Sequence, residues 1–196
     1  MEKIILINNV DTFYNKIWYM KLLSKLHVKI GINYKNRIYY NSSKKHSNDL
    51  DIVLRMLDII NINKRKEKYN LIYDYACEYL DNEFINNNWC NFKNNMCECN
   101  RNKPKEYQTG SCCTRTLTRE TCKYFDNSKK RCSIKCLGCK LFVCNYLRKK
   151  GIKYTSNNVP YLKYFLSLRQ KLISNYTFFK TQEDIINKWL KFYKLP

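Results

Sequence analysis

The chain has little proline, glycine and histidine, and these shortages exclude several kinds of site. Of its 196 residues, three are proline, four are glycine and two are histidine. The scattered glycines form no glycine-rich phosphate loop, and His27 and His46 form neither a histidine-based metal motif nor a Cys/His pair. Because no catalytic constellation is present, the sequence favours a non-enzymatic protein.

Long apolar runs are also absent. Nothing approaches the roughly 18 consecutive apolar residues of a membrane-spanning helix, so we expect no span. The first residues, Met-Glu-Lys-Ile-Ile-Leu-Ile-Asn-Asn, contain too short an apolar run for a secretory signal. A cytoplasmic location is therefore expected.

Acidic residues are few relative to basic ones. The chain has 37 Lys and Arg against 16 Asp and Glu, which gives a formal net charge of +21. Such an excess attracts polyanions, namely nucleic acid, anionic lipid or an acidic protein partner. Many of the basic residues form three clusters, which are Lys64, Arg65 and Lys66; Lys129, Lys130 and Arg131; and Arg148, Lys149 and Lys150. The last cluster has an alternative role as the solvated end of a helix, where cations match the helix dipole.

Hydrophobic periodicity predicts a mainly α-helical protein. Apolar residues recur at spacings of three and four from Phe13 to Leu23, the pattern of an amphipathic helix. A short hairpin or loop is expected at 30–41. Similar patterns predict helices at about 48–60, 71–84 and 140–151, and two more within 152–196, the second opened by a capping box at Thr181 and Asp184.

The pattern divides the chain into three regions within one compact unit. Residues 1–88 form a helical region, 89–151 a cysteine-rich metal-binding module, and 152–196 a helical hairpin. We therefore expect a helical bundle that frames a loop-rich cysteine-cluster module.

Cysteine is abundant and concentrated. Ten of the eleven cysteines lie between residues 90 and 144, and they are Cys90, Cys97, Cys99, Cys112, Cys113, Cys122, Cys132, Cys136, Cys139 and Cys144. The eleventh, Cys77, is expected to be a small core residue. Such density indicates either disulfides or metal ligands. The odd count, the lack of a signal sequence and a length sufficient for a core all favour metal.

The ten clustered cysteines are the candidate ligands, and soft thiolates suit zinc or iron–sulfur clusters. The strongest local pattern is Cys132-Ser-Ile-Lys-Cys136-Leu-Gly-Cys139. Its last two cysteines are expected to form a chelating turn, in which Gly138 lets backbone N–H groups point at sulfur. A helix starting near Lys140 would place Cys139 at its positive end. Only one Cys-x-x-Cys pair is present, and this irregular spacing favours an iron–sulfur cluster, [4Fe–4S] first, over zinc. Ten thiols also allow two centres.

The cysteines come in a distinctive order of short motifs: Cys112-Cys113, Cys122-Lys-Tyr-Phe, Cys132-Ser-Ile and Cys139-Lys-Leu-Phe-Val-Cys144. Over about residues 90–144 this order resembles the zinc- or iron-chelating cysteine-cluster (CxxCxxCC) domain family. The family's Arg-Pro before the closing cysteine is absent, and Cys136-Leu-Gly stands there instead. The resemblance implies metal chelation and supplies no catalytic residue or substrate.

Two functions follow as hypotheses. The first is a metal-binding cysteine-cluster protein, most readily iron–sulfur and otherwise zinc, in a redox or metal-handling role. The second is a structural zinc module that presents the three cation clusters to nucleic acid.

Overall fold

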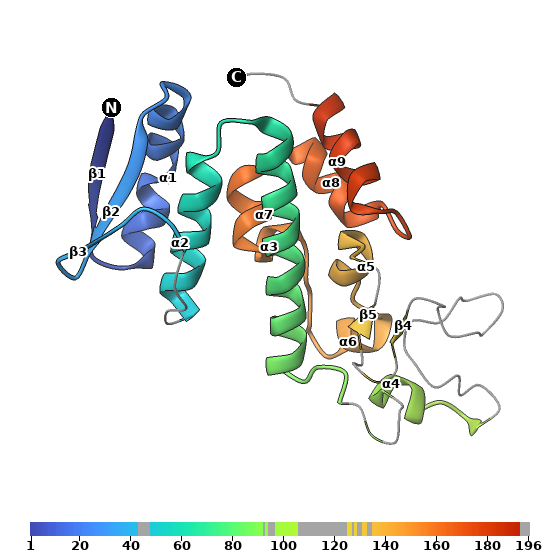
Figure 1. The fold of residues 1–196 in the computed structure, drawn as a ribbon. Coiled ribbons are helices and arrows are strands. Elements are labelled where there is room, and N and C mark those ends of the chain that lie inside the picture. The colour runs from blue at the N-terminus through green and yellow to red at the C-terminus, as the bar shows by residue number, and fades with distance from the viewer. Residues whose placement is uncertain are drawn as a thin grey trace. The chain divides into compact units, whose positions relative to one another are not determined.

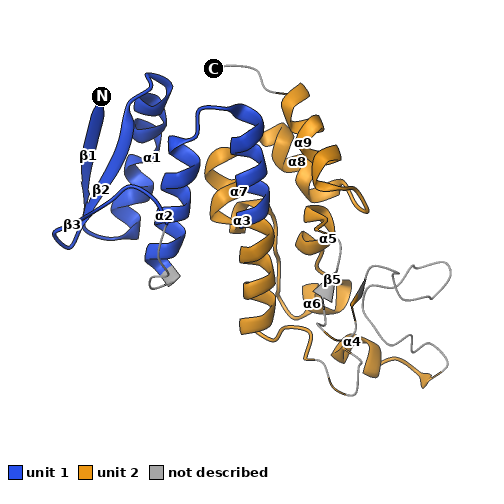
Figure 2. Cartoon of the chain, viewed as in Figure 1, with its two compact units in different colours: residues 1–75 blue, residues 76–196 orange. Residues whose placement is uncertain are grey.

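The computed structural model describes residues 1–42, 48–91, 93, 97–105, 125–126, 128, 131–132 and 135–192, with only the backbone of Asn48, Phe125, Arg131 and Cys132. Within these residues the chain is mainly helical, as predicted (Figure 1). It forms two compact units, Met1–Tyr75 and Ala76–Pro196 (Figure 2). The division into 1–88, 89–151 and 152–196 stays a prediction.

Unit 1 contains a three-stranded sheet. Strand β1 (Glu2–Ile7) pairs in parallel with β2 (Lys29–Tyr34), and β2 pairs antiparallel with β3 (Arg37–Tyr39). Helix α1 (Val10–Lys25) makes the crossover that two parallel strands require. The hairpin expected at 30–41 is confirmed, whereas β1 was not predicted.

Two helices pack on this sheet. Both α1 and α2 (Asn48–Asn61) contact β2. Strand side chains alternate between faces, so one face of the sheet supplies the isoleucines of the core. The buried apolar residues of unit 1 include Ile5, Ile7, Ile30, Ile32, Phe13, Ile17, Met20, Val53, Leu54 and Leu57. The helices predicted there are confirmed, and α3 (Arg65–Asn86) is longer than predicted.

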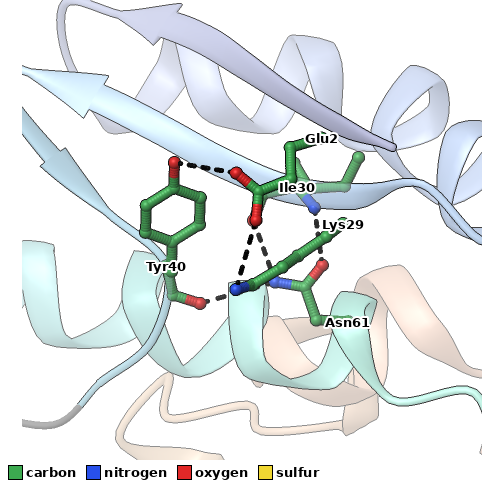
Figure 3. A network of polar contacts seen from close by, with 5 residues as sticks. All are labelled: Glu2, Lys29, Ile30, Tyr40 and Asn61. Atoms are coloured by element: carbon green, nitrogen blue, oxygen red, sulfur yellow. Dashed lines mark hydrogen bonds and ion pairs between the residues drawn. The ribbon is translucent and has the colours of Figure 1, made fainter.

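The side chain of Asn61, the last residue of α2, completes the edge of β2 (Figure 3). Its amide accepts from the Ile30 N–H at 2.9 Å and donates to the Ile30 carbonyl at 2.9 Å. Beside it, Glu2 forms an ion pair with Lys29 at 3.4 Å and accepts from the Tyr40 hydroxyl at 3.4 Å. These contacts fix the start of β2 against α2.

Replacing Asn61 with alanine is expected to destabilise unit 1. The Ile30 N–H and carbonyl would lose partners in a half-buried place, which costs about 2 kcal/mol of unfolding free energy. Urea denaturation and amide exchange at Ile30 measure the loss. The matched control is Asn87→Ala, which removes one exposed bond to the Glu83 carbonyl and should change stability by less than about 0.5 kcal/mol. Equal effects from both variants would contradict this role.

Unit 2 takes the second part of α3 and a series of shorter elements. They are α4 (Glu98–Arg101), β4 (Phe125–Asp126), β5 (Arg131–Cys132), α5 (Leu137–Leu141), α6 (Asn145–Lys149), the 3-10 turn η2 (Ser156–Asn158), α7 (Pro160–Phe165), α8 (Leu168–Tyr176) and α9 (Gln182–Lys191). Helix α8 packs on α5, α9 and η2. The most buried side chains of unit 2 include Trp189, Tyr161 and Leu162. Cys77 is buried too, as predicted.

Two predicted helices of unit 2 are each divided. The helix expected at 140–151 is wrong as a single element, because α5 ends at Leu141 and α6 begins only at Asn145. The first helix expected within 152–196 is likewise interrupted where Ser167 caps α8. The capping box of Thr181 and Asp184 is confirmed at the start of α9.

None of the helices in the described part of the chain has the length and apolar character needed to cross a membrane.

Candidate metal centre

Three short helices of unit 2 each begin directly after a cysteine. Cys97, Cys136 and Cys144 are the N-cap residues of α4, α5 and α6, and none of their side chains makes a capping hydrogen bond. Ser, Thr, Asp or Asn at such a position typically adds about 1 kcal/mol of stability. The three helices lack this stabilisation, because cysteine stands at the N-cap position of each.

The side chains of Cys136 and Cys139 are in contact. Cys136 is fully buried, and its sulfur accepts a hydrogen bond from the Cys139 thiol and from the backbone N–H groups of Cys139, Lys180 and Phe179. With the Cys139 thiol as the largest cause, these donors lower the pKa of Cys136 to about 5, against the opposing effect of burial. Because α5 starts at Leu137, Cys136 and not Cys139 precedes its first turn, contrary to the sequence-based expectation.

One contact favours the neutral thiol instead. Cys136 Sγ lies 3.8 Å from the Thr177 carbonyl oxygen, where only an S–H group can donate. This single long contact is outweighed by the several donors that point at the sulfur. The net effect of these contacts is a lowered pKa of Cys136, which favours the thiolate relative to an ordinary cysteine.

Gly138 explains how α5 approaches α8 so closely. A Cβ atom at residue 138 would lie 2.2 Å from the Thr177 carbonyl oxygen and 3.1 Å from the Ser174 carbonyl oxygen. Only glycine fits this contact without a shift of backbone. The close approach brings the segment after α8 to the Cys136 sulfur, and so Gly138 serves the site through packing rather than through a turn conformation.

Phe179 supplies one of the N–H donors from a strained backbone. Its φ of +58° lies in the left-handed region, which costs a non-glycine residue about 1 kcal/mol or more. The residue is 56% exposed, and its ring lies beside that of Phe178, with the two centroids 6.5 Å apart. Its backbone N–H is one of the donors that lower the pKa of Cys136. Sequence reasoning missed Phe179 and Lys180, because the donors are backbone groups far from the cysteines along the chain.

A second group of thiols lies at the starts of α4 and α6. Glu98 accepts from Lys150 Nζ at 2.8 Å and from the Tyr146 hydroxyl at 2.9 Å, and Asn102 donates to that hydroxyl at 2.8 Å. These bonds join the two helices and bring Cys99 next to Cys144. They also lower the pKa of Glu98, with the Lys150 bond as the largest cause.

The thiols of this group repel one another's charged forms. Burial first, and then the charges of Cys144 and Cys97, together raise the pKa of Cys99 to about 11. Cys99 donates a hydrogen bond to Cys144. The raised pKa keeps Cys99 a neutral thiol near neutral pH, unless a nearby cation compensates the charge of its thiolate.

The structure describes only some of the ten predicted cysteine ligands. Cys90, Cys97, Cys99, Cys136, Cys139 and Cys144, with Cys77, are thiols and not disulfides, which contradicts the disulfide alternative for these seven. Cys112, Cys113 and Cys122 lie outside the described residues, and of Cys132 only the backbone in β5 is described. Within the residues that are described, no three His, Cys, Asp or Glu side chains form a group able to hold a metal ion.

The basic clusters have partly structural roles. Lys150 binds Glu98 and lies over the Tyr146 ring, and Lys64 forms an ion pair with Glu67 at 3.0 Å. Arg65, Lys66, Arg148 and Lys149 are exposed. Lys129 and Lys130 lie outside the described residues, as does the Arg131 side chain. Nucleic-acid binding stays a prediction.

Comparison with known proteins yields no relative: no protein-family model, no curated protein and no solved structure matches this chain.

Proposed function

We propose that this chain is a thiolate-ligated metal-binding protein, with an iron–sulfur cluster or zinc, in a redox or metal-handling role. The observation that carries the proposal is the Cys136–Cys139 turn, in which backbone N–H groups of two separate segments point at one buried sulfur. Hydrogen bonds of this kind orient a thiolate ligand and compensate its charge.

The described residues supply some of the ligands that a zinc ion or an iron–sulfur cluster would need. Cys136 and Cys139 would supply two of the four ligands of a tetrahedral zinc site or a cluster. The other ligands would come from the remaining cysteines of the block. A cluster would supply one-electron transfer, whereas zinc would hold the segments together. Thiols in the reduced form suit the cytoplasmic location expected from the sequence.

Cys97, Cys99 and Cys144 are the candidates for a second centre, but as they lie in the described part of the chain they form no group able to hold a metal ion. A second centre would need these side chains to move together and a further ligand from the cysteine block. On metal binding the thiols would lose their protons. The bonds of Glu98 to Lys150 and Tyr146 would then act as an outer shell that keeps α4 and α6 in place.

The test is anaerobic purification of the full chain followed by metal and sulfide analysis and a visible spectrum. We expect stoichiometric metal in the wild type and a clear loss of it in Cys136→Ala/Cys139→Ala. Alanine is preferred to serine, because serine at residue 136 would cap α5 and stabilise the helix by itself. Iron with sulfide and visible absorbance indicates a cluster, and colourless protein with zinc indicates the alternative metal.

The matched control is Cys77→Ala, which removes a buried thiol of α3 outside the cysteine block. It should lower stability and leave the metal content unchanged. Wild-type protein without bound metal, or equal metal in the double variant and the wild type, would refute the proposed function.

A further inference from the structure

Helix α1 of unit 1 has apolar side chains on both sides. Its buried residues are Phe13, Ile17, Met20 and Ser24, which face the core. On the opposite side, at spacings of four, the exposed fractions are 72% for Trp18, 42% for Leu22 and 68% for Leu26. Tyr19, beside them, is 42% exposed. The result is a continuous outward stripe that the fold of unit 1 does not use.

Lysines accompany this stripe. On α1, Lys21 precedes Leu22, and Lys25, the last residue of the helix, precedes the C-cap residue Leu26. The charges of both lysines act on Lys68 of α3. Burial first, and then repulsion from Lys21 and Lys25, together lower the pKa of Lys68 to about 8. Positive charge therefore gathers beside the exposed stripe, and an anionic surface would complement it. The nearest acidic residue on α1 is Asp11, in the first turn, about two helical turns from Trp18.

The exposed apolar side chains of the stripe and the lysines beside it together determine which kind of partner would fit it. A second copy of the chain would bring another formal net charge of +21 and another set of these lysines, so self-association is opposed. A nucleic acid would satisfy the lysines and leave the leucines in water. An anionic lipid surface satisfies both, because tryptophan and leucine enter the boundary of headgroups and acyl chains while lysines contact the headgroups.

We propose that the outward face of α1 is a peripheral docking site for anionic membranes. Trp18, Leu22 and Leu26 enter the interfacial layer, and Lys21, Lys25 and Lys68 bind the headgroup phosphates. Tyr19 lies at the headgroup level, where amphipathic aromatic rings concentrate. The helix lies in the plane of the membrane surface, in keeping with the absence of a membrane-crossing helix among the described residues.

The test is flotation of the full chain with vesicles of phosphatidylcholine alone and with added phosphatidylserine. We expect binding to the anionic vesicles only, with a steep loss in high salt. Lys21→Gln/Lys25→Gln should weaken binding by about 30-fold, because each lysine near the surface contributes about a fivefold gain. Trp18→Ser/Leu22→Ser should weaken it by at least about 30-fold. Both pairs change surface positions, and circular dichroism verifies folding.

The control is Leu168→Ser/Leu172→Ser on α8, which removes two leucines that are 75% and 47% exposed from another helix. This variant should bind vesicles as the wild type does. Brominated phosphatidylserine should quench wild-type fluorescence, and Trp18→Phe should remove that quenching. Of the other two tryptophans, Trp189 is buried, and Trp89 is half-buried in unit 2 against Phe84 and Tyr154. Equal losses in the α1 and α8 variants would overturn the proposal. So would a wild-type dimer in vesicle-free sedimentation that Trp18→Ser/Leu22→Ser converts to monomer, which would assign the face to a second copy.

Discussion

Replacement of Gly138 with alanine is expected to lower the unfolding free energy by about 3 kcal/mol and to open the Cys136 thiol to reagents. The added Cβ would overlap the Thr177 carbonyl oxygen at 2.2 Å, and both partners are backbone, so α5 and α8 must separate. The gain in helix propensity on replacing glycine, about 1 kcal/mol, does not offset such an overlap. Since Cys136 is fully buried, its alkylation in the wild type should be slow and should accelerate clearly in the variant.

A second glycine provides the comparison. Gly151 has a φ of +84° and nothing within 4 Å of an added Cβ, so alanine there meets only backbone strain. Gly151→Ala should cost about 1 kcal/mol and leave the Cys136 alkylation rate unchanged. Urea denaturation and thiol alkylation measure both effects. A Gly138→Ala protein as stable as the wild type would show that α5 does not pack on α8 as described.

Loss of the Lys140–Asp81 ion pair is the second large effect expected. Lys140 of α5 donates to Asp81 of α3, and the side chains are only 6% and 24% exposed. Lys140→Met keeps most of the side-chain volume and leaves the carboxylate without its ammonium partner in a place shielded from water. Removal of one partner of a buried pair costs about 3–5 kcal/mol, and we expect the lower end because Asp81 retains some solvent contact.

Two further variants separate the charge from the packing. Lys140→Met/Asp81→Asn removes both charges and should recover most of the lost stability. Lys64→Met breaks the Lys64–Glu67 pair, whose side chains are 80% and 57% exposed, and should change stability by less than about 1 kcal/mol. Urea denaturation of all three gives the comparison. Equal losses for Lys140→Met and Lys64→Met would show that the Lys140 pair is solvated.

Elements with a strong helical period were predictable from the sequence. Of the predicted stripe, Phe13, Ile17 and Met20 are buried, whereas Leu23 is half-buried. The capping box of Thr181 and Asp184 opens α9, as predicted. Strand β1 was missed because its run Lys-Ile-Ile-Leu-Ile shows no alternation, and its parallel partner lies beyond a whole helix. The breaks at Cys144 and Ser167 were missed because the apolar spacing continues through them.

The candidate site was predictable in its chemistry and not in its surroundings. The spacing of Cys136 and Cys139 indicated a chelating turn, and the structure brings these two thiols together. The N–H donors of Phe179 and Lys180 come from tertiary packing, which leaves no local signal. The pairing of Cys99 with Cys144 likewise depends on Glu98 and Tyr146. The remaining predicted ligands stay predictions.

The boundary between the two units falls inside α3, between Tyr75 and Ala76 (Figure 2). A cut there would sever a continuous ladder of helical hydrogen bonds and leave new unsatisfied ends on both fragments. Division of the chain at this boundary is therefore expected to cost helical structure in both parts, because α3 contributes residues to each unit.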